Sequence, residues 1–170
     1  MTQTRSEART RTFSWSDPAP VAALVGRRDG LDLLQAMARG ELPPPPITDL
    51  IGIDEITAEP GSVTFYLRPQ EFHYNPLGSV HGGVISTLLD SACGCSVHAA
   101  LPAGVGYTSL DLTVKFLRPV TLDSGRLACR GEVVQKGRRT ALAQAQLTDE
   151  SGRLLAHATS TCLLFDIPAS

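Results

Sequence analysis

Residues 79–102 form a stretch with almost no charge, in which Asp90 is the one formally charged residue. The stretch is rich in Val, Ile, Leu, Ala and Gly, but it also contains two histidines and three glycines. A membrane span should be more uniformly apolar, so this composition favours a helix buried within a protein. The sequence therefore predicts a long helix from about Gly82 to Ala100, which other elements must cover.

Alternating apolar and polar residues, the pattern of strands, fill the rest of the chain on both sides of this helix. Two such segments, 51–57 and 62–68, flank a turn at Glu59-Pro60-Gly61. Four more follow the helix with short turns between them and no room for further helices, at 108–117, 126–135, 141–148 and 154–165. Consecutive strands joined by short turns pair antiparallel. We predict an α+β fold with an antiparallel sheet of about six strands and one long central helix.

The N-terminal part of the chain differs from this pattern. Residues 1–29 are polar and poorly patterned, and we predict a disordered arm. Residues 30–46 combine a short amphipathic helix at 31–39 with a proline-rich linker. This helix either packs on the domain surface or forms a flap over a pocket. Residues 47–170 are the predicted domain.

Composition excludes several function classes. The net charge of the 170 residues is −2, and no basic excess points to nucleic acid or an anionic membrane. Residues 1–17 contain no apolar secretory segment, and with four cysteines this predicts a reduced, cytoplasmic protein. Cys93 and Cys95 point to different sides of the predicted helix, so they cannot readily chelate one metal. We expect no metal and no cofactor.

Asp90 is the first candidate for chemistry, because a lone carboxylate in an apolar helix is costly unless it is paired or functional. None of its neighbours on the helix is cationic. The residues alone leave three alternatives open: a catalytic acid, a carboxylate satisfied by hydroxyls or a distant arginine, or exposure at the helix edge. Asp111 is the rival carboxylate, but it shares its strand register with Lys115, so we expect it to be solvated or paired.

Three further patterns have both a functional and a structural interpretation. His81-Gly82-Gly83 opens the helix, where free backbone N–H groups can stabilise an oxyanion or simply begin a helix. Asn75 precedes a proline, which is a turn signal in its own right. Lys136-Gly-Arg-Arg139 places three cations at one hairpin turn, where they either bind an anion or face solvent.

The order Asn75-x5-His81-Gly82-Gly83-x6-Asp90 resembles the signature of hotdog-fold acyl-CoA thioesterases of the phenylacetate-degradation type, a group that includes one branch of the 4-hydroxybenzoyl-CoA thioesterases. The likeness continues through Phe-Leu-Arg-Pro at 116–119 and the hairpin at 136–139, and covers roughly residues 47–165. It implies a hotdog fold, in which the sheet wraps around the central helix, and hydrolysis of an acyl-CoA thioester.

The resemblance also implies roles for individual residues. Asp90 matches the catalytic acid, which acts as nucleophile or as general base toward water at the thioester carbon. The Gly82 N–H matches the oxyanion donor. His81 orients its loop or contacts the thioester region, and the Asn75 amide lies near the thioester carbonyl or the attacking water. The Ser109 hydroxyl, with Thr108 as the fallback, holds the water or the carboxylate. The expected substrate and CoA contacts are Gly83, Thr87, Gly137, Arg138 and Arg139.

Gly82 and Asp90 cannot serve the same site from one chain, because eight residues of helix separate them by roughly 12 Å. We therefore predict a two-fold homodimer with shared sites, and the resemblance adds that such dimers often pair into tetramers. Two other functions remain open. One is a hotdog acyl-thioester dehydratase or hydratase, which the His-Gly-Gly to Asp90 spacing disfavours. The other is a non-catalytic acyl-CoA sensor, which would usually carry a DNA-binding helix-turn-helix.

Overall fold

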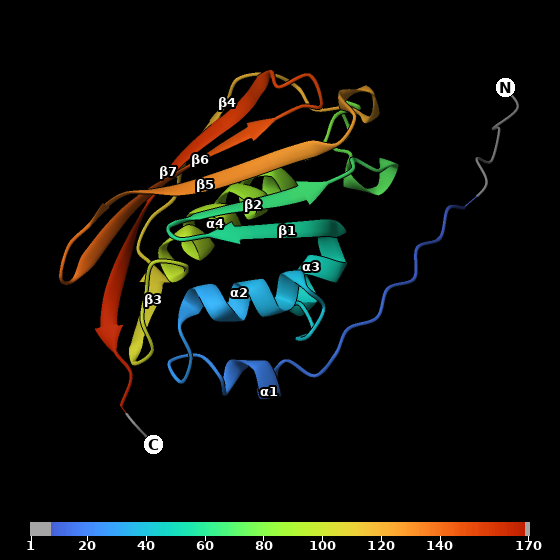
Figure 1. Cartoon of the computed structure of the whole chain (residues 1–170). Coiled ribbons are helices and arrows are strands. Elements are labelled where there is room, and N and C mark those ends of the chain that lie inside the picture. The colour runs from blue at the N-terminus through green and yellow to red at the C-terminus, as the bar shows by residue number, and fades with distance from the viewer. Residues whose placement is uncertain (1–7, 169–170) are drawn as a thin grey trace, which may run out of the picture.

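The computed structural model describes residues 8–168 as an antiparallel sheet with one long helix against it and a helical N-terminal segment (Figure 1). The helices are α1 (Ala19–Ala22), α2 (Gly30–Ala38), α3 (Pro46–Ile51) and α4 (Gly82–His98), with 3₁₀ turns η1 (Glu71–His73) and η2 (Leu122–Ser124). The strands are β1 (Ile53–Glu59), β2 (Ser62–Leu67), β3 (Val105–Ser109), β4 (Thr113–Phe116), β5 (Leu127–Lys136), β6 (Thr140–Thr148) and β7 (Leu154–Asp166).

The sheet has seven strands in the order β1-β2-β5-β6-β7-β3, and β4 pairs with β7 beyond the end of β3. The segment predicted as one strand at 108–117 is thus two strands, which is why the expected number of about six is one short. Asp111 causes the interruption. Its carboxylate accepts the backbone N–H of Thr161 at 3.1 Å, and its carbonyl accepts the Ser160 hydroxyl at 2.7 Å. These two hydrogen bonds take the place of backbone bonds between strands. They give β7 bonding partners at the point where β3 ends.

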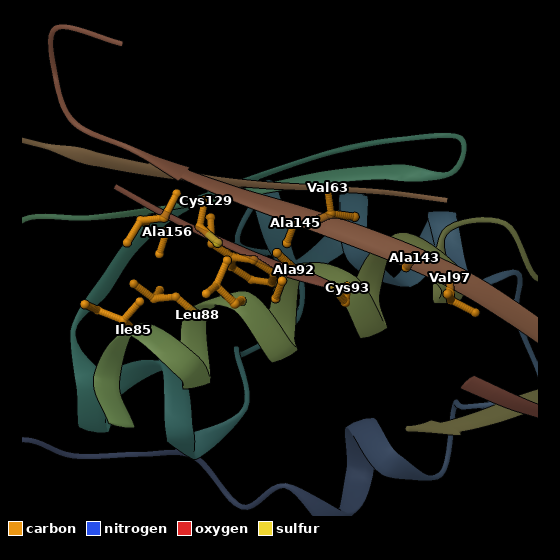
Figure 2. Packing of buried hydrophobic residues seen from close by; sticks show 14 of the residues in the cluster. Val63, Ile85, Leu88, Ala92, Cys93, Val97, Cys129, Ala143, Ala145 and Ala156 are labelled. Carbon is orange, nitrogen blue, oxygen red and sulfur yellow. The ribbon is translucent and has the colours of Figure 1, made fainter. Parts of the chain in front are cut away.

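Helix α4 packs on β2, β5, β6 and β7, and the sheet curves around it (Figure 1). Large residues of the helix meet small ones of the sheet: Leu88 lies near Ala156 (Figure 2). A Cβ on Gly131 of β5 would lie 2.0 Å from the Ala92 carbonyl oxygen, so only glycine allows this approach. A sheet wrapped around one long helix is the predicted hotdog arrangement, and α4 ends two residues earlier than expected.

The N-terminal segment lies against the other side of this core. Residues 8–18 run along the molecule to α1, and α2 packs on β1 (Figure 1). Helix α2 is amphipathic as predicted, but its buried face is Leu33, Leu34 and Ala36. The expected face was wrong: of Leu31, Leu34, Met37 and Ala38 only Leu34 is buried, and Ala38 is exposed. The first strand begins at Ile53 rather than at residue 51, because α3 occupies Pro46–Ile51. Residues 1–7 of the predicted arm lie outside the described residues, and the division at residues 29 and 46 stays a prediction.

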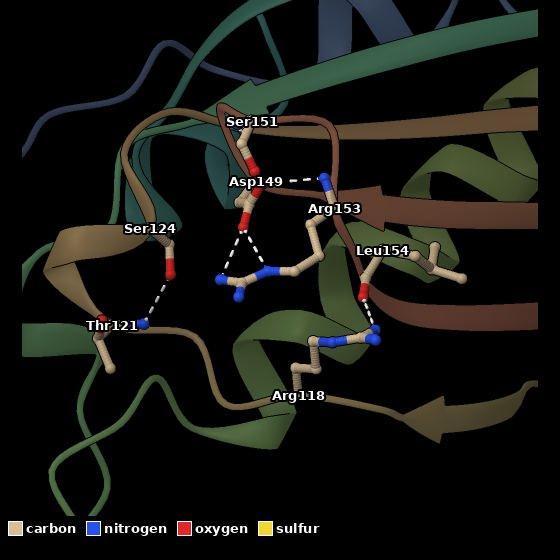
Figure 3. A network of polar contacts seen from close by, with 7 residues as sticks. All are labelled: Arg118, Thr121, Ser124, Asp149, Ser151, Arg153 and Leu154. Atoms are coloured by element: carbon tan, nitrogen blue, oxygen red, sulfur yellow. Dashed lines mark hydrogen bonds and ion pairs between the residues drawn. The ribbon is translucent and has the colours of Figure 1, made fainter.

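The turn between β6 and β7 is held by one carboxylate, Asp149, which is buried (Figure 3). Its Oδ1 accepts the Ser151 hydroxyl at 2.6 Å and the Arg153 backbone N–H at 3.0 Å, and its Oδ2 accepts the Arg153 guanidinium at 3.0 Å. The hydrogen bond from Ser151, together with those from Arg153, lowers the pKa of Asp149 to about 2. Nearby, Arg118 donates to the Leu154 carbonyl at 2.6 Å and braces the chain after β4.

Candidate functional site

Asp90 lies midway along α4 and is exposed, although most of the helix around it is buried. The Ser109 hydroxyl donates to Asp90 Oδ1 at 3.5 Å. Ser109 is the last residue of β3, the strand at one edge of the sheet. The pair expected from the resemblance is therefore in contact. In a single chain water still reaches the Asp90 carboxylate, so its desolvation costs little free energy. Only a partner molecule or a substrate would exclude that water.

Tyr107 and Cys95 line the same region. A Cβ on Gly94, one helical turn after Asp90, would lie 3.1 Å from the Tyr107 ring. Burial raises the pKa of the Cys95 thiol to about 12, and the negative charge of Asp90 adds to this effect. Burial likewise raises the pKa of Tyr107. Both groups thus stay protonated at neutral pH, so neither is a ready nucleophile. Tyr107 was missed from the sequence, although its position two residues before Ser109 places both on one strand face.

The start of α4 presents one free donor. His81 is the N-cap residue, and its Nδ1 accepts the Gly83 N–H at 2.9 Å. Within residues 8–168, the Gly82 N–H has no hydrogen-bond partner. The exposed Phe116 ring lies beside it, 3.2 Å from where a Cβ of Gly82 would stand. The Gly82 N–H is thus available to an oxygen of a ligand, and the helix dipole favours negative charge there.

Two of the predicted substrate contacts, Gly83 and Thr87, form hydrogen bonds at the start of α4 itself. The Thr87 hydroxyl donates to the Gly83 carbonyl at 2.9 Å, and the Gly83 N–H is used by His81. The contacts of Thr87 and Gly83 with substrate stay predictions.

Asn75 holds its own loop. Its Oδ1 accepts the backbone N–H groups of Leu77 at 2.9 Å and Ser79 at 3.3 Å, and its Nδ2 donates to the Ser79 hydroxyl at 3.2 Å. The turn interpretation of Asn75 is confirmed by these bonds. Its predicted contact with the thioester or with water stays a prediction.

The hairpin between β5 and β6 presents two unpaired cations. The Gly137 N–H closes the turn by donating to the Thr140 carbonyl at 2.8 Å, and Lys136 donates to the Ala100 carbonyl at 2.8 Å. Arg138 and Arg139 are exposed, and in the described part of the chain their guanidinium groups have no ion-pair or hydrogen-bond partner. They are therefore free to meet an anion.

The candidates lie in three separate places: the start of α4, the Asp90–Ser109 pair, and the hairpin. One chain brings Asp90 and Ser109 together but leaves Gly82 roughly 12 Å away along the helix axis. Between residues 8 and 168 no cluster of three or more His, Cys, Asp or Glu residues could hold a metal ion. Over the same residues, no helix is both long enough and apolar enough to cross a bilayer.

An antiparallel sheet wrapped around one long helix is the architecture of the hotdog class. Residues 77–156 match the family described as the thioesterase superfamily. The chain is 32% identical to a solved phenylacetic acid degradation-related protein of Ralstonia eutropha, with a TM-score of 0.68 over 76% of this chain and 98% of that one. The chain belongs to the thioesterase superfamily and is a thioester hydrolase.

Two further relatives agree with this assignment. A thioesterase family protein of Silicibacter pomeroyi is 28% identical, with a TM-score of 0.68 over 85% of this chain and 98% of that one. The human acyl-coenzyme A thioesterase 13 is 26% identical over 107 residues, which are 62% of this chain and 75% of the human protein. The family match includes Gly82, Asp90 and Ser109, and it leaves out the N-terminal segment that carries α1, α2 and α3.

Proposed function

We propose that the protein hydrolyses acyl-CoA thioesters to a free carboxylic acid and coenzyme A, with Asp90 as the reacting carboxylate. The observation that carries this proposal is the exposed Asp90 on α4 with the Ser109 hydroxyl on its Oδ1. The similarity to the human acyl-coenzyme A thioesterase supports the choice of thioester. Within residues 8–168, no thiol with a low pKa offers an alternative nucleophile.

Two routes fit this carboxylate. As general base, Asp90 takes a proton from water while the water oxygen bonds to the thioester carbon, and the resulting oxyanion collapses to expel the CoA thiolate, which takes the proton. As nucleophile, an Asp90 oxygen attacks the same carbon, CoA leaves, and water hydrolyses the mixed anhydride. Ser109 orients the carboxylate in either route.

The oxyanion needs a donor that this chain cannot bring to Asp90. We propose that the partner subunit's Gly82 supplies its free N–H in a homodimer with antiparallel α4 helices, and that such dimers pair into tetramers. The same dimer would bring the partner subunit's Asn75 and His81 to Asp90. We also propose a cytoplasmic location, since all four cysteines are free thiols.

The coenzyme A part of the substrate carries phosphates. We propose that Arg138 and Arg139 bind them, that the Gly137 turn lets the nucleotide approach the backbone, and that Gly83 and Thr87 line the path at the helix start. The exposed, unpaired guanidinium groups on the hairpin support this assignment.

A thiol-release assay with a panel of acyl-CoA esters tests the function. The wild-type protein should release CoA, whereas Asp90→Asn should lower the rate by about 10²–10⁴-fold, the usual worth of a positioned base. Asp111→Asn is the matched control, because an amide oxygen can still accept the Thr161 N–H. Near-normal turnover by Asp90→Asn would remove Asp90 from the reaction. No thiol release by the wild type from any ester would favour a dehydratase or a sensor.

A further inference from the structure

A cavity of about 600 Å³ lies between the N-terminal segment and the core. Ala22 of α1, Ala38 of α2 and the proline linker form one wall, and Ser91 and His98 of α4 with Tyr107 of β3 form the other. The volume is typical of a small-molecule site, and most of the lining is apolar. A second hollow, of about 440 Å³, is lined by residues of β1, β2, β5 and β6 and shares no residue with the first.

The cavity lies next to the catalytic pair, although neither Asp90 nor Ser109 lines it. Ser91, which lines it, follows Asp90 directly, and Tyr107 stands two residues before Ser109 on β3. Along α4 the cavity is lined from Ser91 to His98, a length of roughly 10 Å. A group attached to a thioester carbon beside Asp90 is therefore close enough to reach the cavity.

His98 gives the cavity wall a polar side chain at its far end. The side chain is only 9% exposed, and its Nδ1 has no hydrogen-bond partner within the described residues. Burial lowers the pKa of His98, so the ring is neutral near pH 7 and compatible with a largely apolar ligand.

The wall contributed by the N-terminal segment is firmly docked. Asp29 accepts the Ala103 N–H at 2.8 Å, and the Gly30 N–H donates to the Leu101 carbonyl at 3.0 Å. A Cβ on Gly30 would lie 2.0 Å from the His98 carbonyl oxygen, so α2 begins in direct contact with the end of α4. The segment therefore holds a fixed position over the cavity although it lies outside the family match at 77–156.

We propose that residues 17–48 form the outer wall of the acyl pocket and thereby select the acyl group, a largely apolar one of at least medium chain length. This proposal rests on the proposed function, in which the thioester carbon is attacked beside Asp90. The pocket wall follows from the cavity, from the docked N-terminal segment, and from Ser91 and Tyr107, which line the cavity beside the catalytic pair.

Tryptophan substitutions test the wall. Ala22→Trp and Ala38→Trp place a large ring in the cavity, and Ala23→Trp adds the same ring at the neighbouring exposed position, which does not line it. We expect both cavity variants to lower kcat/KM for decanoyl-CoA by about tenfold or more and to change acetyl-CoA hydrolysis less than twofold. Ala23→Trp should behave as the wild type on both esters. Equal effects on the two esters, or no effect, would overturn the proposal.

Binding of decanoic acid, measured by isothermal titration calorimetry, separates this proposal from the proposed function. If the wild type binds decanoic acid and the cavity variants do not, the pocket stands even where no ester is hydrolysed, and only the proposed function fails. The wild type could turn over decanoyl-CoA while the cavity variants bind decanoic acid as tightly as the wild type and keep its chain-length preference. That result would place the acyl pocket elsewhere. Failure of the wild type to bind decanoic acid, with no preference for decanoyl-CoA over acetyl-CoA, would also overturn it.

Discussion

The Ser109 hydroxyl lies 3.5 Å from Asp90 Oδ1 and ties the end of the edge strand β3 to the middle of α4. The two residues are 19 positions apart in the chain. The contact is long for an O–H···O bond, so it orients the carboxylate more than it stabilises its charge.

Ser109→Ala should therefore lower kcat by about tenfold, less than Asp90→Asn, because a hydrogen bond to a charged group contributes about 1.5–3 kcal/mol and this one is at the weak end. Ser109→Thr keeps the hydroxyl and should restore most of the rate. Steady-state kinetics with thermal melts would check this. A Thr variant as slow as the Ala variant, with an unchanged melting temperature, would show that the hydroxyl has no positioning role.

Arg138→Ala combined with Arg139→Ala should raise KM for acyl-CoA esters about tenfold, because charge-assisted bonds to phosphate are lost. Hydrolysis of a short thioester without the nucleotide should hardly change. Arg130→Ala is the control, since Arg130 is an exposed arginine that contacts Ser62 elsewhere on the sheet. The same loss on both kinds of thioester would mean that the hairpin does not bind coenzyme A.

Mixed dimers test the shared site. Asn75→Ala and Asp90→Asn should each be nearly inactive alone, the first because its loop loses the bonds that hold Ser79. In a heterodimer of the two variants, one site carries both defects and the other carries neither. Co-expression should then recover substantial thiol release. If mass spectrometry proves that heterodimers formed and activity stays absent, both groups act from one chain.

Acid titration tests Asp149. Its pKa is lowered from 3.8 to about 2 in the folded chain, so its stabilising contribution is complete above about pH 4 and is lost as the pH falls toward 2. Asp149→Asn should thus melt at a lower temperature than the wild type at pH 7, and the gap should close between about pH 4 and pH 2. Asp123→Asn, at an exposed carboxylate with no ion pair among residues 8–168, should show no such gap. If the difference in melting temperature between the wild type and Asp149→Asn persists unchanged to pH 2, the lowered pKa of Asp149 does not stabilise the fold.

Local patterns predicted the elements that have strong periodicity. Helix α4 and strands β2, β5, β6 and β7 lie within two residues of their predicted bounds, because side-chain alternation follows directly from strand and helix geometry. The break between β3 and β4 was not predictable in this way, since Asp111 accepts the backbone N–H of Thr161 in β7, 50 positions away in the chain.

By itself, the sequence determined that a long uncharged helix with a single carboxylate must be covered by an antiparallel sheet, because only burial accommodates so apolar a helix. The tertiary structure alone decided which groups meet that carboxylate. Ser109 reaches Asp90, Tyr107 covers Gly94, and the N-terminal segment closes a cavity that ends at His98. These contacts join residues far apart in the chain, and local periodicity contains no information about distances between segments that folding brings together.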